Sequence, residues 1–230
     1  MTPAKPKIPK PVPFDWSELQ QFKAEKRFLD GYPADTRTFF SPRDDVHGVL
    51  TSLIASAQHA IVVNMYGYDD DDIDDIIRAK LKSEHVYVQM SLDKSQAGGV
   101  HERKLLAQWD NTKFGNSIAI GSSARSAISH LKICIVDGVY TVKGSTNWSL
   151  SGEQKQDNEL TISRNAVIAA ETRAQLDMNH DWMLKQMAKA RAEGKPAGAP
   201  AEDGGEPAAK PGRKFTRSTS GAKPRARQRR

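Results

Sequence analysis

Polar residues whose side chains could do chemistry are concentrated in one short stretch of the chain, SHLKICIVDGVYTVKGSTNWS. They are His130, Lys132, Asp137, Ser145 and Asn147. An imidazole can act as a nucleophile or as an acid and base near neutral pH, and a lysine offers a cation with three donors. Together with the uncharged donors of Ser and Asn, this set suits a phosphate diester, whose equatorial oxygens gain negative charge in the transition state.

A metal ion is not expected in this chemistry, because no carboxylate cluster and no Cys/His set with zinc spacing lies near the stretch in the sequence.

A β-hairpin is the element expected to position these residues. Successive side chains of a strand point to opposite faces, so His130 and Lys132 share a face. A two-residue turn at 137–138 would place Lys132 opposite Lys143 and His130 opposite Ser145, which gathers the polar set on one patch. Like charges directly opposite each other are destabilising. Either an anion lies near the two lysines or the turn is longer, and the sequence leaves both open.

Alternating strands and helices surround the hairpin. A short helical piece at 15–31, capped by Asp15 or Ser17, precedes them. The patterns predict strands at 36–40, 59–68, 86–93, 116–123 and 158–163. They predict helices at 41–58, 69–84, 98–109 and 165–192. Ser41 is the expected N-cap of the first of these helices, with Pro42 in its first turn. Alternation followed by consecutive strands predicts an α/β sandwich with a mixed sheet.

The motif H-x-K-x4-D followed by G-S-x-N is present as HLKICIVDGVYTVKGSTN, residues 130–147. In these residues the chain resembles the phospholipase D superfamily, and residues 36–190 are similar in layout to its small single-motif members, the bacterial endonuclease-like proteins. The resemblance implies a phospholipase D-like α/β/α sandwich with a mixed central sheet and helices on both faces. It also implies a homodimer in which two chains share one composite active site.

The resemblance further implies a mechanism without a cofactor. His130 of one subunit attacks phosphorus and forms a phosphohistidine, and His130 of the other subunit protonates the leaving oxygen and then activates water. Lys132 and Asn147 bind the non-bridging oxygens, Ser145 assists, and Asp137 has an orienting or a structural role.

Further candidate residues follow from the same resemblance. Family members commonly carry a carboxylate C-terminal to the Asn that orients the nucleophilic His; Glu159 is the candidate here and Asp157 its rival. The loop DKSQAGG follows a predicted strand and resembles a loop at the mouth of the family's active site. Its candidate substrate contacts are Lys94, Ser95 and Gln96.

Three other features allow both a functional and a structural interpretation. Trp148 follows Asn147 and either stacks on a base or belongs to the core. The acidic run at 69–75 either binds a cation or forms the solvated N-terminal end of a helix, where acids are favoured; the sequence favours the solvated face. His47 has no partner at an informative spacing and is expected to be an ordinary helix residue.

The 230 residues suit one domain with tails: a Pro-rich leader and short helix at 1–35, a catalytic domain at 36–192 and a disordered basic tail at 193–230. The net charge of +6 belongs to the tail, because nine Lys or Arg and no acid lie in 210–230. Without those nine, 25 basic residues stand against 28 acidic ones, a charge of about −3. No signal peptide is recognisable, and the single Cys cannot form an internal disulfide, so a cytoplasmic protein is expected.

These features favour a metal-independent, non-specific nuclease that cleaves DNA or RNA. The single motif, the lack of an apolar membrane-binding element and the basic tail favour nucleic acid as the partner, with phosphate contacts made by the tail and the active site. A membrane is the less favoured partner, although the tail would also bind an anionic surface. The alternatives are a phospholipase D that acts on lipid headgroups and a catalytically silent scaffold that binds nucleic acid.

Overall fold

The computed structural model describes residues 14–83, 85–96 and 115–195. The helix expected at 98–109 and most of the basic tail lie outside the described residues. Among the described helices, none is long and apolar enough to cross a bilayer.

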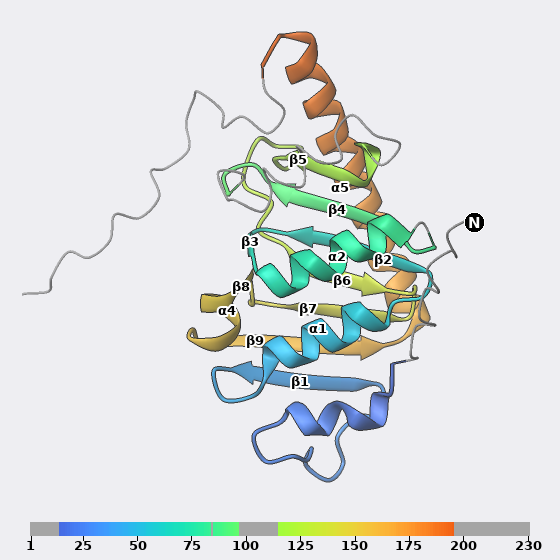
Figure 1. The fold of residues 1–230 in the computed structure, drawn as a ribbon, viewed down its shortest axis with the longest axis vertical. Helices are drawn as coiled ribbons and strands as arrows, with labels where there is room; N and C mark the ends of the chain where they lie inside the picture. The colour runs from blue at the N-terminus through green and yellow to red at the C-terminus, as the bar shows by residue number, and fades with distance from the viewer. Residues whose placement is uncertain (1–13, 84, 97–114, 196–230) are drawn as a thin grey trace, which may run out of the picture. The chain divides into compact units, whose positions relative to one another are not determined.

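Seven strands of the described residues form one mixed sheet (Figure 1). Their order is β1-β9-β7-β6-β2-β4-β5. β2, β4 and β5 pair in parallel, whereas β6 pairs antiparallel with β2, and β6, β7, β9 and β1 continue antiparallel. The strands are β1 (Thr36–Ser41), β2 (Ala60–Met65), β4 (Tyr87–Asp93), β5 (Ile118–Gly121), β6 (Lys132–Val136), β7 (Tyr140–Gly144) and β9 (Asn158–Arg164).

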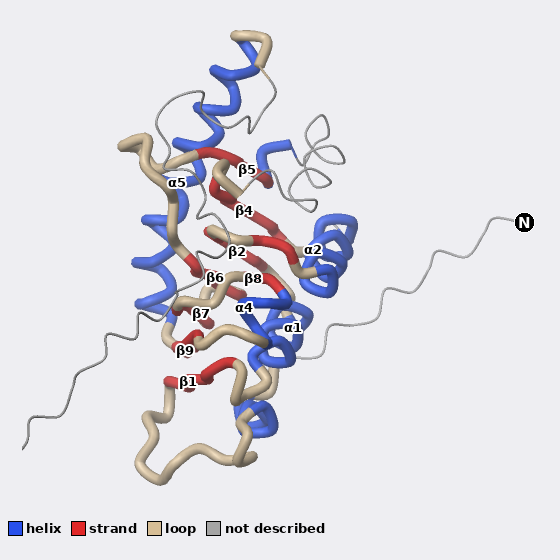
Figure 2. The backbone as a smooth tube through the Cα atoms, turned by 90° about the vertical axis from the view of Figure 1, so that its left-hand side faces the viewer, coloured by secondary structure: helices blue, strands red, loops and turns tan. Residues whose placement is uncertain are grey.

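Helices cover both faces of this sheet. α1 (Val46–Ser56) and α2 (Asp71–Ser83) lie on one face, and α5 (Ala166–Ala192) lies on the other (Figure 2). Strands that are covered on both faces read as nearly continuous apolar runs, as the central β2 does with AIVVNM. The predicted α/β/α sandwich with a mixed central sheet is confirmed.

The N-terminal caps differ in part from the prediction. Asp15 caps the 3₁₀ helix η1 (Trp16–Phe22), as one of the two alternatives predicted. Ser41 does not cap α1; that cap is Asp45, whose carboxylate accepts a hydrogen bond from the Gly48 N–H at 2.8 Å. Ser41 instead ends β1 and donates its hydroxyl to backbone oxygens of the segment that follows Asn147.

The acidic run at 69–75 is not simply a solvated face. Asp70 and Asp74 are each only 4% exposed, although the other four acids are exposed. The Asp74 carboxylate accepts hydrogen bonds from the Tyr68 hydroxyl at 2.9 Å and from Arg78 Nε at 2.6 Å. Every third or fourth residue of α2 faces the sheet, and here that periodicity turns an acid inward.

The hairpin has a longer turn than the two residues predicted. Val136 pairs with Tyr140 and Ile133 pairs with Lys143, so the turn spans 137–139. Of the two alternatives for the lysines, the longer turn is correct: Lys143 lies opposite Ile133 and shares its face, away from that of Lys132. The predicted pairing of His130 with Ser145 is therefore wrong.

Short elements that the sequence patterns did not predict surround the motif. They are η2 (Gly115–Ser117), a parallel pair made of β3 (Tyr68–Asp69) and β8 (Trp148–Ser149), and α4 (Leu150–Gln154). Each is too short for hydrophobic periodicity to be visible. β3 and β8 join the segment after β2 to the segment that carries Asn147.

Candidate active site

The His-x-Lys pair lies at the start of β6, where Lys132 pairs with Met65 at the end of β2. Lys132 Nζ lies 3.1 Å from His130 Nε2 and donates to the His130 carbonyl oxygen at 3.3 Å. His130 is exposed, whereas Lys132 is only 7% exposed. The structure therefore places an accessible imidazole directly beside a nearly buried ammonium group.

The ring of Tyr66 packs against both His130 and Lys132. The sequence patterns did not identify Tyr66 as a site residue. Its ring centroid lies 4.6 Å from that of His130 at an interplanar angle of 64°, and Lys132 Nζ lies 4.8 Å from the Tyr66 centroid. The available signal was an aromatic residue directly after an apolar strand. Gln96, a predicted substrate contact, donates to the Tyr66 hydroxyl at 3.3 Å and so lies close to the site.

The electrostatic state of Lys132 suits an anion. Burial lowers the pKa of its ammonium group below the ordinary lysine value, because desolvation penalises the charged form. Among the residues that the structure describes, no carboxylate pairs with Lys132. A nearly buried cation without a counter-ion gains more from an arriving phosphate oxygen than a solvated lysine would.

Buried polar residues hold the backbone immediately before His130. The Ser129 N–H donates to Asp93 Oδ2 at 2.5 Å, and the Ser129 hydroxyl donates to Asn64 Oδ1 at 3.1 Å. Asp93 is 1% exposed and Asn64 is fully buried. The sequence carried a signal for both, since each is a polar residue inside or at the end of an otherwise apolar strand.

Asn147 reaches the same end of the sheet through β8. The Trp148 N–H donates to the Gly67 carbonyl at 2.9 Å, which holds Asn147 against the residue that follows Tyr66. Asn147 Oδ1 is buried and has no hydrogen-bond partner among the described residues. The fold therefore does not use this oxygen as an acceptor.

Gly67 permits this approach, because a Cβ at that position would lie 2.9 Å from Asn147 Cγ. We expect Gly67→Ala to displace Asn147 and to lower kcat/KM by about 10- to 100-fold, the order of loss that misplacement by about 1 Å produces. Gly194→Ala, at the end of α5, is the control: its φ of 70° makes alanine cost some stability, but no atom lies within 4 Å of the new Cβ, so kcat/KM should stay at the wild-type value. Steady-state kinetics check this; a Gly67→Ala enzyme with wild-type kcat/KM contradicts it.

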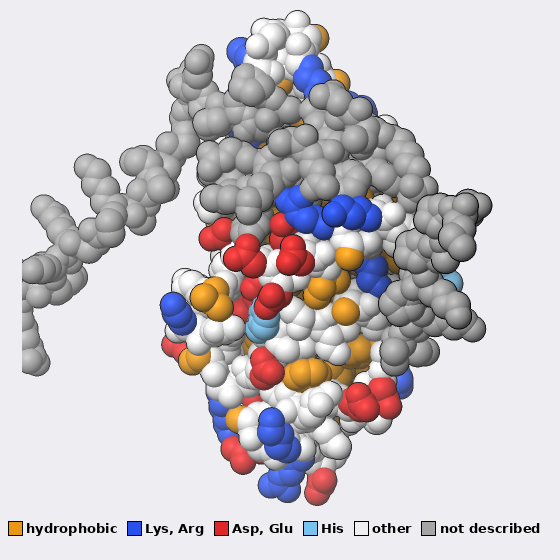
Figure 3. Space-filling model, viewed as in Figure 1, with side chains coloured by type: hydrophobic (Ala, Val, Ile, Leu, Met, Phe, Trp, Pro, Cys, Tyr) orange, Lys and Arg blue, Asp and Glu red, His pale blue; other side chains and the backbone are white. Residues whose placement is uncertain are grey.

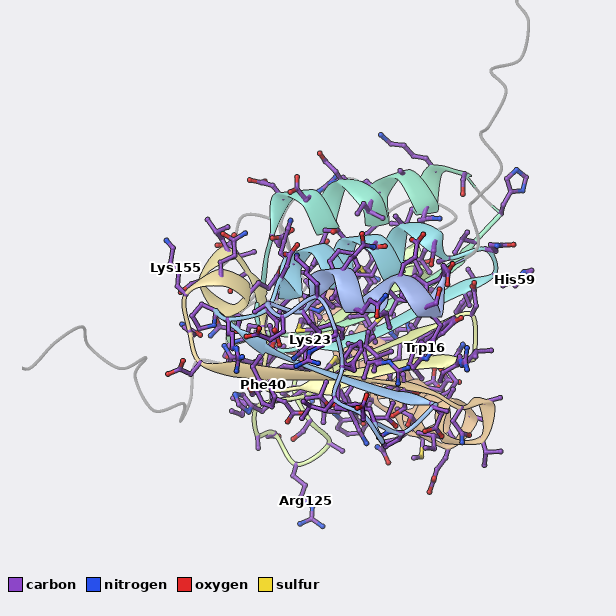
Figure 4. The ribbon with its side chains drawn as sticks, turned by 90° about the horizontal axis from the view of Figure 1, so that it is seen from below. Trp16, Lys23, Phe40, His59, Arg125 and Lys155 are labelled. Carbon is purple, nitrogen blue, oxygen red and sulfur yellow. The ribbon has the colours of Figure 1, made fainter. Side chains whose placement is uncertain are left out.

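Asp137 lies at the opposite end of β6 from His130. Its carboxylate accepts backbone N–H groups of Gln58, His59 and Ala60, the last two at 2.7 and 2.9 Å. Figure 4 shows His59 at one end of the layers and Lys155, just after α4, at the other. Of the two predicted roles, the geometry supports the structural one, and Asp137 is removed from the catalytic set.

Ser145 is engaged with β9 rather than with His130. Its hydroxyl donates to Asn158 Oδ1 at 2.9 Å and accepts the Glu159 N–H at 3.0 Å. The hydroxyl proton and one of its lone pairs are thus used to fasten the motif to the neighbouring strand, so the structure directs no hydrogen bond from Ser145 to His130.

Glu159 and His130 border one open groove of about 400 Å³, together with Lys132 and Lys143. The Glu159 carboxylate accepts a hydrogen bond from Thr161, and no bond joins it to His130 among the described residues. Its rival Asp157 is exposed and precedes β9, which begins at Asn158. Of the two carboxylates, only Glu159 borders this groove, but by strand alternation its side chain shares the face of Thr161 and Lys143, away from that of Lys132.

The remaining predicted substrate contacts fall in different surroundings. Trp148 is 1% exposed and packs near Tyr68, with ring centroids 6.3 Å apart, so the prediction that it stacks on a base is wrong. The exposed Ser95 donates its N–H to Asp93 Oδ1 at 2.9 Å. Lys94 borders a second depression of about 420 Å³, next to Trp182 of α5.

A family model described as "Cardiolipin synthase, PLD-like domain" matches residues 50–182, more than half of the chain. The chain therefore belongs to the phospholipase D-like superfamily of phosphodiesterases, as the fold and the His-x-Lys site indicate. None of the curated proteins matches it.

Solved structures agree in fold. Nuc from Salmonella typhimurium, a phospholipase D family member, superposes with a TM-score of 0.53 at 22% identity, over 64% of this chain and 93% of Nuc. NucT from Helicobacter pylori superposes with a TM-score of 0.53 at 20% identity, over 65% of this chain and 95% of NucT. Phosphatidylserine synthase from Haemophilus influenzae superposes with a TM-score of 0.51 at 11% identity, over 71% of this chain and 48% of the synthase.

Proposed function

We propose that this chain is a metal-independent nuclease that cleaves phosphodiester bonds through a phosphohistidine at His130. The observation that carries the proposal is the contact of 3.1 Å between Lys132 Nζ and His130 Nε2, in which the nearly buried ammonium group has no carboxylate partner among the described residues. A phosphate oxygen is the anion that such a pair would take up beside a nucleophile.

The proposed reaction has two displacements at phosphorus. His130 Nε2 attacks phosphorus, the bond to the leaving oxygen breaks, and that oxygen receives a proton from a second imidazole. Lys132 leaves the imidazole nitrogen and binds a non-bridging oxygen, and the Asn147 amide binds another. Water, deprotonated by the second imidazole, then releases the phosphate product and restores His130.

The second imidazole would come from a second copy of the chain. Each chain has one His-x-Lys motif, and the other described histidines are bonded or placed elsewhere: His47, His59, His85 and His180. A two-fold dimer would bring two copies of His130 to the axis. The exposed position of His130, at the edge of an open groove, is compatible with this arrangement.

Subunit mixing tests the dimer. Wild-type chains are exchanged with an equal amount of His130→Ala chains under conditions that allow reassembly. Activity per total protein should fall to about one quarter, because random pairing leaves about that fraction of dimers fully wild-type. A value near one half would mean that each chain works alone and that the second catalytic group lies within the chain.

Nucleic acid is the proposed substrate, because of the nine cations at 210–230. Nuc and NucT carry nuclease-type names, whereas the family description and the Haemophilus neighbour name lipid enzymes. The direct experiment supplies supercoiled, linear and single-stranded DNA, and separately phosphatidylcholine, in EDTA at a temperature well below unfolding. DNA cleavage supports the proposal; strict dependence on added magnesium, or turnover of the lipid alone, would overturn it.

Deletion of residues 210–230 should weaken DNA binding and flatten its dependence on salt. Each cation that meets a phosphate releases counter-ions, so loss of several such contacts lowers the slope of log K against log salt by about 0.9 per contact. The rate at saturating substrate should change little. Binding titrations at several salt concentrations measure this, and an unchanged slope would show that these residues make no phosphate contacts.

A further inference from the structure

A second cluster of polar side chains lies outside the catalytic groove, on the face that α1 and α2 cover. Figure 3 shows acidic side chains gathered around a histidine near the N-terminal ends of these two helices. Its members are His47 of α1, Asp70 directly before α2 and Glu153 of α4, and one ligand atom of each lies within 4.8 Å of the others. Three elements far apart in sequence therefore meet at one point.

The carboxylates of this cluster are buried. Glu153 is 1% exposed and Asp70 is 4% exposed, and both face one nitrogen of His47. His47 Nδ1 lies 2.8 Å from Glu153 Oε2 and 3.3 Å from Asp70 Oδ2. Two buried carboxylates that share a single imidazole leave a negative charge even when the imidazole is protonated, and an unbalanced buried charge is costly.

Glu153 supplies an independent sign of a missing positive partner. Its second oxygen, Oε1, is buried and has no hydrogen-bond partner among the described residues. One oxygen of this buried carboxylate lies beside His47, and the other has no partner among the described residues. A bound cation would supply the missing partner.

Outer hydrogen bonds orient the three groups as they do around metal ligands. Asp72 Oδ2 lies 3.1 Å from His47 Nε2, so a proton on that nitrogen has an acceptor, and an ion bound at the cluster would take the Nδ1 lone pair in place of the hydrogen bond to Glu153. Asp70 Oδ1 accepts the Ile73 N–H at 2.8 Å, which leaves Oδ2 directed at His47. A carboxylate on the far nitrogen of a histidine is the usual companion of a histidine that binds a metal.

We infer that His47, Asp70 and Glu153 form a binding site for one divalent transition-metal ion, of the Zn²⁺ or Mn²⁺ class. A divalent charge balances the two carboxylates, and the mixed imidazole and carboxylate ligands suit these ions better than Mg²⁺ or Ca²⁺, which prefer oxygen alone. This inference is independent of the proposed nuclease function, because none of the three residues lies in the groove of His130.

The consequence of binding is a cross-link within the fold. α4 follows β8 and Asn147 directly, and Asp70 follows β3, which pairs with β8. An ion bound to Glu153 and Asp70 would fasten these two segments to each other and to α1. The ion therefore stabilises the fold and takes no part in bond cleavage. The sequence-based prediction that His47 is an ordinary helix residue is wrong, because it contacts three carboxylates.

The experiment titrates Mn²⁺ into the untagged, full-length, EDTA-treated chain and follows free Mn²⁺ by electron paramagnetic resonance. One ion should bind per wild-type chain, and the ion should raise the midpoint of thermal unfolding. Glu153→Gln, which keeps the shape of the protonated carboxyl, should lower the affinity by about 100-fold or more, and Asp72→Asn by about 10-fold. Asp75→Asn, the same change at another exposed acid of α2, is the control and should bind as the wild type does.

If Glu153→Gln does not fold, His47→Gln takes its place, because His47 is only partly buried. Zn²⁺ should displace the bound Mn²⁺, whereas Mg²⁺ at the same concentration should not. Folded wild-type protein that binds no Mn²⁺ would overturn the inference, as would binding that Glu153→Gln leaves unchanged. Displacement by equimolar Mg²⁺ would overturn the assignment to transition metals.

Discussion

His130→Ala should lose at least about 10⁴-fold in kcat, because the proposed mechanism uses the His130 imidazole of one chain as the nucleophile and that of a second chain as the proton donor. The fold should persist, since the His130 side chain is exposed and only its carbonyl oxygen and ring contact Lys132 and Tyr66. Initial rates on DNA in EDTA, together with circular dichroism melts, measure both effects.

The control for this variant is His59→Ala. His59 is exposed at the far end of the layers, and its bond to Asp137 uses the backbone N–H, which alanine retains (Figure 4). It should keep wild-type kcat. A His130→Ala protein within about tenfold of wild-type kcat would show that His130 is not the nucleophile.

Lys132→Met should act in opposite directions on activity and on stability. Activity should fall by about 10³-fold, the order of loss when one donor to a developing oxyanion is removed. The midpoint of thermal unfolding should stay the same or rise, because methionine fills the volume of a nearly buried cation that has no carboxylate partner among the described residues.

Lys155→Met is the matched control, since Lys155 is exposed at the end of α4 and should change neither property. A large drop in the melting midpoint of Lys132→Met would mean that Lys132 has a structural role, and its loss of activity would then say little about the phosphate.

The sequence predicted most of the architecture because long elements carry strong periodic signals. The apolar run of β2 and the amphipathic α2 were expected within a few residues of their observed bounds. The cap of α1 was not, because Ser41 and Asp45 are both good caps and only the tertiary contact of Ser41 with the α4 segment decides between them. The register of the hairpin depends on one extra residue in the turn, which local sequence does not specify.

For the candidate site, the motif predicted which residue types matter but not which of them touch. Lys132 lies beside His130. Asp137 and Ser145 instead accept backbone N–H groups elsewhere, those of Ala60 and Glu159 respectively. Tyr66 directly follows β2 and Asp93 ends β4, and their proximity to the His130 segment follows from the order of the strands in the sheet. The cluster of His47 and Glu153 was not predicted either, because the two residues meet only through the tertiary fold and 105 residues lie between them along the chain.

The stereochemical course at phosphorus tests the phosphohistidine most directly. A phosphorothioate diester of known configuration at the scissile phosphorus is hydrolysed by the wild-type enzyme in water enriched in ¹⁸O, and the configuration of the product is determined. Attack by His130 followed by attack of water gives two in-line displacements, so the account predicts overall retention. Inversion would mean that water attacks the diester in a single step, and the covalent role of His130 would be contradicted.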